Sequence, residues 1–173
     1  MRRWLWLAQS APVATQASAP DVAAATGKSV KGSGYTFIAP TGWAEPKDAE
    51  AQQGIDTFVA DMTDTDGFAD NVNVLLSPAG EVTPERVETQ GVKELRDAGT
   101  TDVTTRDRTT IAGSESAHLS AIFPHDTGQY QVDQFYVTHD KQTYIMTFSF
   151  STTVSEADRD ALCSSVLQTW AWA

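Results

Sequence analysis

The strongest indication of the fold lies in residues 102–151, DVTTRDRTTIAGSESAHLSAIFPHDTGQYQVDQFYVTHDKQTYIMTFSFS. It holds four runs rich in β-branched and aromatic residues, which we predict to be strands. The turns between the runs are short, and a parallel crossover needs a dozen or more residues. The runs therefore predict an antiparallel meander. Its strands are expected at Asp102–Ile111, Ser116–Phe123, Gln129–His139 and Thr143–Ser151.

The last two runs differ in how their apolar residues alternate. Large apolar residues occupy every second position from Tyr144 to Phe150, which is typical of a half-buried strand. In the preceding run, Tyr130 and Val132 share one parity, whereas Phe135 and Val137 have the other. A bulge between the two pairs would explain this change, and so would a strand that is covered on both faces. The sequence leaves both explanations open.

A helix is predicted between the first strands and the meander. Thr83 is a good N-cap, Pro84 suits the first helical position, and Gly99 supplies the C-cap. Gly91 in mid-helix costs about 1 kcal/mol relative to Ala, so we expect the helix to approach the sheet closely there. Further elements are expected at Gly34–Ile38, Gly54–Asp61 and Asn71–Ser77 as strands, and at Ser155–Trp170 as a closing helix.

These elements predict an α+β domain, with a mostly antiparallel sheet of about six to seven strands flanked by two helices. We place the domain at residues 30–173. Residues 1–29 are rich in Ala, Ser, Thr and Pro and lack any helical or strand period, so we interpret them as a tail or linker.

Charge excludes two classes of partner. The chain has 173 residues and a formal net charge of −11. Residues 1–29 carry three basic and one acidic side chain, so the rest of the chain has nine basic and 22 acidic ones, a net charge of −13. A surface for nucleic acid or for anionic lipid needs clustered Lys and Arg.

No apolar run approaches the roughly 20 residues of a transmembrane helix. The sequence indicates no cofactor.

The N-terminus resembles a secretion signal. MRRWLWLA, residues 1–8, places two arginines before an apolar run, and Ala17-Ser18-Ala19 could be a cleavage site. The apolar run is shorter than usual, and a disordered, accidentally apolar N-terminus that results from a misplaced start codon is the competing interpretation. The acidic, Lys-poor domain favours export, with a cytoplasmic location as the alternative.

The acidic segment at residues 61–70, DMTDTDGFAD, is the most suggestive stretch for binding. With Gly67 as the sixth position of a calcium loop, Asp64 and Asp66 stand at the third and fifth. Met62 then fills the first position and Asn73 the last, where a bidentate Glu is required. A solvated loop that meets a partner is the better interpretation, its charge would suit a basic partner, and no metal site is predicted. The expected contact positions are Asp61, Asp64, Asp66, Asp70 and Trp43, although for Trp43 the favoured alternative is that it plugs the sheet edge into the core.

No catalytic residue is predicted. Cys163 lies on the apolar stripe of the closing helix, where a buried thiol is the simpler explanation. His118 is out of phase with its apolar neighbours and should face solvent or a second helical layer. His118 and His125 are the candidates for a hydrolase, which we consider a weaker hypothesis because neither has a sequence neighbour that forms a dyad.

Several motifs in order resemble the PsbP-like superfamily. Pro40-Thr41-Gly42-Trp43 after the first strand is similar to the start of that fold, and Asp70-Asn71-Val72-Asn73-Val74 is similar to its later strand. Composition is most similar to the LpqN-type exported lipoproteins of actinobacteria. The resemblance implies an α/β/α sandwich and a mostly non-enzymatic role. Lipid anchoring is not supported, since no Cys precedes Cys163.

We therefore expect an exported or envelope-associated binding domain, not an enzyme, that recognises a protein or an envelope component. The first alternative is a carrier that holds a small apolar or glycolipid molecule between sheet and helix. A hydrolase or a calcium-binding protein is a less favoured alternative.

Overall fold

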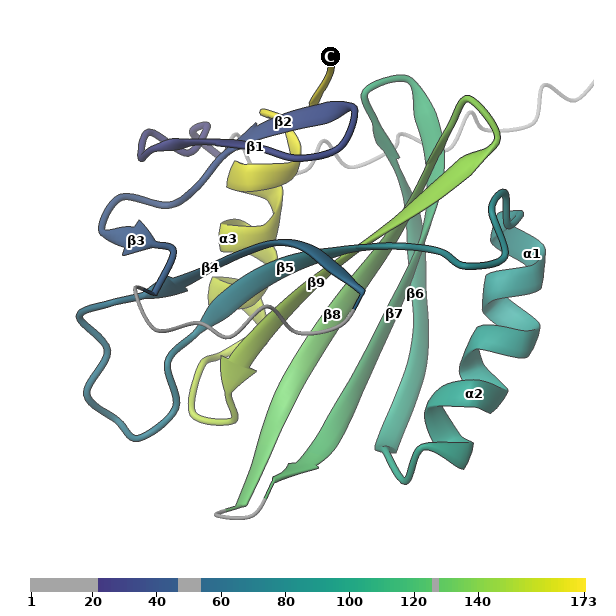
Figure 1. The fold of residues 1–173 in the computed structure, drawn as a ribbon. Helices are drawn as coiled ribbons and strands as arrows, with labels where there is room; N and C mark the ends of the chain where they lie inside the picture. Colours follow the sequence, from purple (N-terminus) through teal and green to yellow (C-terminus); the bar gives the residue numbers. More distant parts are fainter. Residues whose placement is uncertain (1–21, 47–53, 126–127) are drawn as a thin grey trace, which may run out of the picture.

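The computed structural model describes residues 22–46, 54–125 and 128–173, and Figure 1 shows their arrangement. The signal-like start lies outside the described residues. The strands are β1 (Ser29–Lys31), β2 (Tyr35–Ile38), β3 (Trp43–Ala44), β4 (Ile55–Asp61), β5 (Asn71–Leu76), β6 (Thr101–Ile111), β7 (Ser114–His125), β8 (Gly128–His139), β9 (Gln142–Ser151) and β10 (Ala171–Trp172). The helical elements are α1 (Pro84–Arg86), the π-helical stretch η1 (Val87–Gly91), α2 (Val92–Asp97) and α3 (Glu156–Leu167).

The main sheet has seven strands in the order β3-β4-β5-β9-β8-β7-β6, and every neighbouring pair is antiparallel. The chain enters at one edge, leaves after β5 through the first helical region, and returns at the opposite edge as β6. The meander β6 to β9 then runs inward until β9 pairs with β5. The predicted fold class is confirmed: a mostly antiparallel sheet with two helical regions.

The change of parity in β8 is explained by burial on both faces. Pairing of β8 with β7 and with β9 runs without a register shift through Asp133 and Gln134. Val132 packs with the helix α1–α2 on one face, whereas Phe135 and Val137 pack with α3 on the other. The alternative of a bulge in β8 is therefore wrong, and the bulges lie in β4 and β6 instead.

Two hydrophobic clusters lie on opposite faces of the sheet. The larger cluster joins Met146 and Phe148 of β9 to Val166 of α3, and all three side chains are fully buried. The smaller cluster joins Leu119 of β7 to the buried Leu95 of α2. Full burial of such a side chain contributes about 1.5–3 kcal/mol. The two clusters hold one helical region against each face.

The helix approaches the sheet closely at Gly91. A Cβ atom at Gly91 would lie 3.3 Å from Cδ1 of Leu119 and 3.4 Å from Cγ1 of Val87. The expected reason for this glycine is confirmed. Thr83 accepts the backbone N–H of Arg86, and Gly99 ends the helix with a φ of +85°, so both predicted caps are present.

The predicted strand at Gly34–Ile38 belongs to a separate small sheet, which the sequence pattern does not indicate. Its order is β1-β2-β10, so the second strand of the chain pairs with the last one. The partners are three and two residues long, too short to give a periodic signal. The chain contacts α3 from Val22 onward, because the Gln168 side chain donates to the Val22 carbonyl and Ala25 N–H to the Ser165 carbonyl.

Candidate functional site

The acidic loop, residues 61–70, folds on its own carboxylates. Asp61 accepts the backbone N–H of Thr63 at 2.8 Å, and Asp64 accepts that of Asp66 at 3.0 Å. Asp66 in turn accepts the backbone N–H of Phe68 at 3.0 Å, which lowers the pKa of Asp66. These local turns are a known use of aspartate and need no bound ion. Among the described residues, no group of three or more His, Cys, Asp and Glu side chains is arranged to hold a metal.

Asp70 differs from the other aspartates of the acidic loop. Its carboxylate accepts the backbone N–H of Ser151 at 2.8 Å and ties the loop to the end of β9. Burial raises the pKa of Asp70 to about 6, and the nearby charges of Asp64, Asp66 and Asp61 act in the same direction, while the Ser151 N–H opposes them. Asp70 therefore titrates well above an ordinary aspartate.

Trp43 does not lie on the surface. It begins β3 beside Asp61 of β4, and its side chain is 5% exposed within the larger hydrophobic cluster. Its expected role as a contact position is corrected accordingly, because a side chain buried in the core offers a partner almost no surface. Trp43 is a core residue, as the competing interpretation expected.

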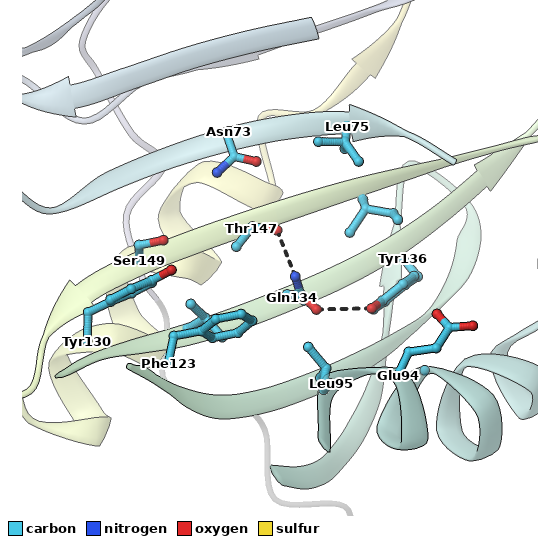
Figure 2. Close-up of a pocket in the computed structure, with 13 residues that line it drawn as sticks. Asn73, Leu75, Glu94, Leu95, Phe123, Tyr130, Gln134, Tyr136, Thr147 and Ser149 are labelled. Carbon is cyan, nitrogen blue, oxygen red and sulfur yellow. Dashed lines mark hydrogen bonds between the residues drawn. The ribbon is translucent and has the colours of Figure 1, made fainter. Parts of the chain in front are cut away.

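A groove of about 360 Å³ lies on the sheet face that carries α1–α2 (Figure 2). The helices of this face pack mainly on β6 and β7. Half-buried side chains of β5 and β9, among them Leu75 and Ile145, therefore form a floor that remains accessible. Glu94 and Leu95 of α2 form one wall.

Polar side chains of the groove floor are only partly engaged with one another. Gln134 donates to Thr147 Oγ1 at 3.2 Å and accepts from the Tyr136 hydroxyl at 3.0 Å. Asn73 and Ser149 also line the groove, and neither side chain hydrogen-bonds another described residue (Figure 2). Ser149 is only 6% exposed, but its hydroxyl is not among the described atoms that are shielded from solvent without a partner, so a ligand in the groove can reach it.

A row of aromatic rings joins the groove to the acidic loop. Tyr130 lines the groove and stacks on Phe123, with ring centroids 5.5 Å apart. Phe68, from the acidic loop, stacks on Tyr130 at 5.1 Å. Residue pairing places Tyr130 opposite Ser151, the residue that binds Asp70. The acidic loop therefore lies at one end of the groove.

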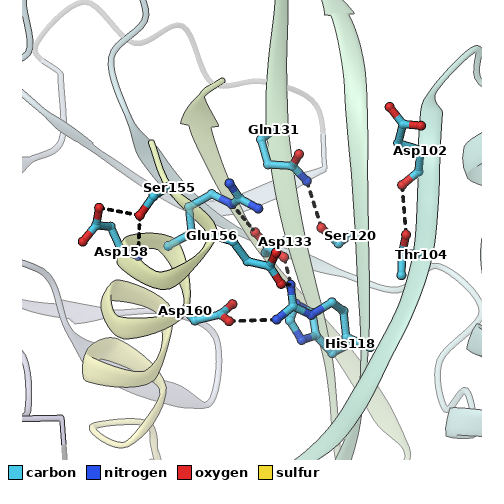
Figure 3. Close-up of polar contacts among 12 residues, drawn as sticks. Asp102, Thr104, His118, Ser120, Gln131, Asp133, Ser155, Glu156, Asp158 and Asp160 are labelled. Atoms are coloured by element: carbon cyan, nitrogen blue, oxygen red, sulfur yellow. Dashed lines mark hydrogen bonds and ion pairs between the residues drawn. The ribbon is translucent and has the colours of Figure 1, made fainter. Parts of the chain in front are cut away.

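A buried polar cluster lies on the opposite face of the sheet, under α3 (Figure 3). His118 of β7 bonds Asp133 of β8 through Nε2 at 3.0 Å, and Arg159 of α3 donates to the other carboxylate oxygen at 3.2 Å. Asp133 is 1% exposed. Burial by itself would raise its pKa, but the His118 hydrogen bond and the charges of His118 and Arg159 outweigh burial and lower it.

Sequence reasoning did not find this cluster. His118 was expected to face solvent or a helical layer, and it faces the helical layer under α3. Its partner, Asp133, comes from the next strand. His118 pairs with Phe135 and Asp133 pairs with Ser120, so the imidazole and the carboxylate are diagonal neighbours on one face. A histidine and an aspartate on predicted neighbouring strands were the available signal, and only the register shows that their side chains share a face.

A second pocket, the α3 pocket, lies between the sheet and α3 and has a volume of about 450 Å³. His118 and Phe135 line it from the sheet, and Ala161 and Cys163 line it from α3. Cys163 is 2% exposed, and burial raises the pKa of its thiol, so the thiol is held in its unreactive form. His118 contacts a carboxylate and the Phe135 ring, at a centroid distance of 4.1 Å.

Comparison with known proteins identifies the fold. The solution structure of PsbP from the cyanobacterium Synechocystis sp. PCC 6803 superposes with a TM-score of 0.58 and 17% identity, over 91% of this chain and 99% of that one. The fold is PsbP-like. The crystal structure of LpqN from Mycobacterium tuberculosis has a TM-score of 0.54 and 14% identity, over 83% of this chain and 88% of that one. A Pseudomonas aeruginosa protein of unknown function has a TM-score of 0.51 and 13% identity, over 73% and 88%.

The expected resemblance to the PsbP-like fold is thus confirmed at the level of structure. No protein-family model matches the sequence, and no curated protein matches it either. In the part of the chain that the structure describes, no helix is long and apolar enough to span a membrane.

Proposed function

We propose that this protein is an exported, non-catalytic binding domain that recognises a partner in the cell envelope through the groove of Figure 2. The observation that carries this proposal is the sheet face at β5 and β9, where the Asn73 and Ser149 side chains bond no described residue and lie beside apolar Leu75 and Ile145. Concave surfaces that mix apolar area with a few polar groups are typical of binding sites.

Three further observations support the proposal. The basic, apolar start of the sequence is typical of export. LpqN, which shares the fold, is described as involved in cell envelope biogenesis. The buried His118 is engaged with Asp133 and the Phe135 ring, and this arrangement favours a structural role over catalysis.

The test is capture of partners from a cell-envelope extract with the full chain and two variants. Asn73→Trp adds a large ring to the groove floor at a half-buried position whose side chain makes no hydrogen bond to a described residue. Thr105→Trp makes the same kind of change on β6, outside the groove. We expect Asn73→Trp to lose the specific partner and Thr105→Trp to retain it. Equal recovery by all three proteins would refute the groove as the recognition site.

A second candidate function, a carrier of a small apolar or glycolipid molecule, is favoured by the α3 pocket. Its 450 Å³ and the apolar part of its lining, Phe135, Ala161 and Leu167, fit a short acyl chain between sheet and helix. Charged residues, among them Arg106 and Asp160, also line the pocket. Native mass spectrometry of the protein purified from its own cells tests this function. A bound lipid that disappears in Ala161→Phe, with the groove intact, would favour the carrier over the partner-binding domain.

A further inference from the structure

Charge is unevenly distributed around the groove. Among the described residues that line it, Glu94 is the only charged one. The acidic loop at its end contains four aspartates and no Lys or Arg. The local turns use one oxygen each of Asp61, Asp64 and Asp66, and the second oxygens of Asp64 and Asp66 accept only long contacts of 3.4 Å. The groove thus offers a negative field at one end and an uncharged floor along its length.

The link between the acidic loop and the groove is fixed by packing. Phe68 stacks on Tyr130 at a centroid distance of 5.1 Å, and the two rings are inclined by 16°. Asp66 accepts from the Thr153 hydroxyl at 3.4 Å, and Asp70 binds the Ser151 N–H at 2.8 Å. The carboxylates are therefore held in place before any partner arrives, and their ordering costs a partner no binding energy.

The floor offers hydrogen-bonding groups to a ligand. Ser149 as a residue is only 6% exposed, its hydroxyl has no hydrogen-bond partner among the described residues, and Figure 2 shows that hydroxyl at the groove. The hydroxyl is not one of the described side-chain atoms that are shielded from solvent without a partner, so it stays open to a group from outside the chain. The Asn73 amide on the neighbouring strand β5, which bonds no described residue, offers both a donor and an acceptor.

We propose that the groove binds an extended basic segment of a partner protein. Its Lys or Arg side chain lies along Phe68 and Tyr130 toward Asp64 and Asp66, and apolar residues of the same segment cover Leu75 and Ile145. This inference rests on the proposed function of the groove and names the chemistry of its partner.

The dimensions and chemistry of the groove agree with such a segment. Ile145 and Ser149 are four residues apart on β9, a span of about 13 Å, which matches about four residues of extended peptide. A backbone in that position can bond the Ser149 hydroxyl and the Asn73 amide. Lys and Arg pack their aliphatic stems on apolar surface while their charged ends reach outward, which suits a row of rings beside carboxylates.

The probe is a random heptapeptide library displayed on phage and selected on the immobilised full chain at low salt. We expect selected peptides to contain Lys or Arg on one side of two or three apolar residues. A synthetic peptide of the selected sequence is then titrated by fluorescence anisotropy at low salt and again at several-fold higher salt. Its affinity should fall with salt, because the contacts at the acidic loop are exposed to solvent.

Two variants assign the binding. Asp64→Asn/Asp66→Asn removes two charges but keeps oxygen acceptors for the backbone N–H groups of the turns. We expect roughly tenfold weaker peptide binding, since each exposed ion pair contributes a modest amount. Asp102→Asn/Asp107→Asn on β6 makes the same change in net charge away from the groove and should leave affinity within about twofold.

The outcomes separate this inference from the proposed function. Selection of uncharged or acidic peptides, no selection at all, or full affinity in Asp64→Asn/Asp66→Asn would each overturn the basic partner. If Asn73→Trp still abolishes envelope capture in those cases, the groove remains the binding site and only the partner chemistry is wrong. If, in those cases, Asn73→Trp captures the envelope partner as well as the wild type does, both the basic partner and the proposed function of the groove are wrong.

Discussion

Replacing Asp70 with asparagine should make the protein more stable, and the gain should depend on pH. Asp70 is half-buried beside three other aspartates, and burial together with their charges raises its pKa from 3.8 to about 6. An asparagine side chain at this position is uncharged at every pH, and its oxygen can still accept the Ser151 N–H. The substitution therefore removes the unfavourable charge and keeps the link between the acidic loop and β9.

The sign follows from proton binding. Because the pKa of Asp70 is higher in the folded state, the folded protein binds more protons than the unfolded chain between about pH 4 and 6. Wild-type stability thus loses this contribution as pH rises through that window. A shift of about two pKa units corresponds to about 3 kcal/mol. Since the carboxylate is partly exposed, screening by water reduces the expected effect to about 1–1.5 kcal/mol.

The assay is urea unfolding of wild type and Asp70→Asn in small pH steps from below the unfolded pKa to well above the folded one. We expect the difference in free energy of unfolding to grow in favour of the variant from about pH 4 to about pH 7 and then to stay constant. Asp107→Asn, which changes the same charge on an exposed part of β6, should show no such growth. A difference for Asp70→Asn that stays flat or shrinks with rising pH would contradict the expected cost of the Asp70 charge.

Three other predictions concern stability and reactivity. Gly91→Val should destabilise the protein by about 1–3 kcal/mol in urea unfolding, because a Cβ there already lies 3.3 Å from Leu119; an unchanged midpoint would contradict the close approach. Asp133→Asn should lower the free energy of unfolding by about 3 kcal/mol at neutral pH, because His118 loses its buried charged partner. Since the pKa of Asp133 is lowered in the folded state, this loss of stability should become smaller below about pH 4. A loss of stability that does not change with pH would contradict the role of the Asp133 charge. The Cys163 thiol should react with a disulfide reagent only after unfolding, and rapid reaction of the native protein would show that the thiol is open to solvent.

The meander shows what the periodicity of apolar residues can predict and what it cannot. Alternation of apolar residues from Tyr144 to Phe150 predicted the inward face of β9, and the short turns predicted its antiparallel neighbours. For β8, periodicity showed only that the parity changes between Val132 and Phe135. The choice between a bulge and double coverage depended on where α1–α2 and α3 lie, which no local pattern contains.

The candidate site was predictable in one part and not in the others. The acidic loop was recognised from its composition, but its position at the end of a groove depends on the stacking of Phe68 on Tyr130, residues far apart in sequence. Trp43 illustrates the opposite case. A tryptophan beside a turn looked the same from the sequence whether it served a partner or the core, and only its burial decides.

Local sequence patterns were enough to predict the α+β class, the two helical regions and their caps, the order of the meander and the acidity of the domain. These features follow from interactions between residues close in sequence, or from composition alone. Three other features appear only in the folded molecule: the small sheet that joins β2 to β10, the bond from His118 to Asp133, and the place of the Ser149 hydroxyl in the groove. Each of these depends on strand register and on the layer that covers a face, because side chains distant in sequence meet only when the backbone places them on the same face at neighbouring positions.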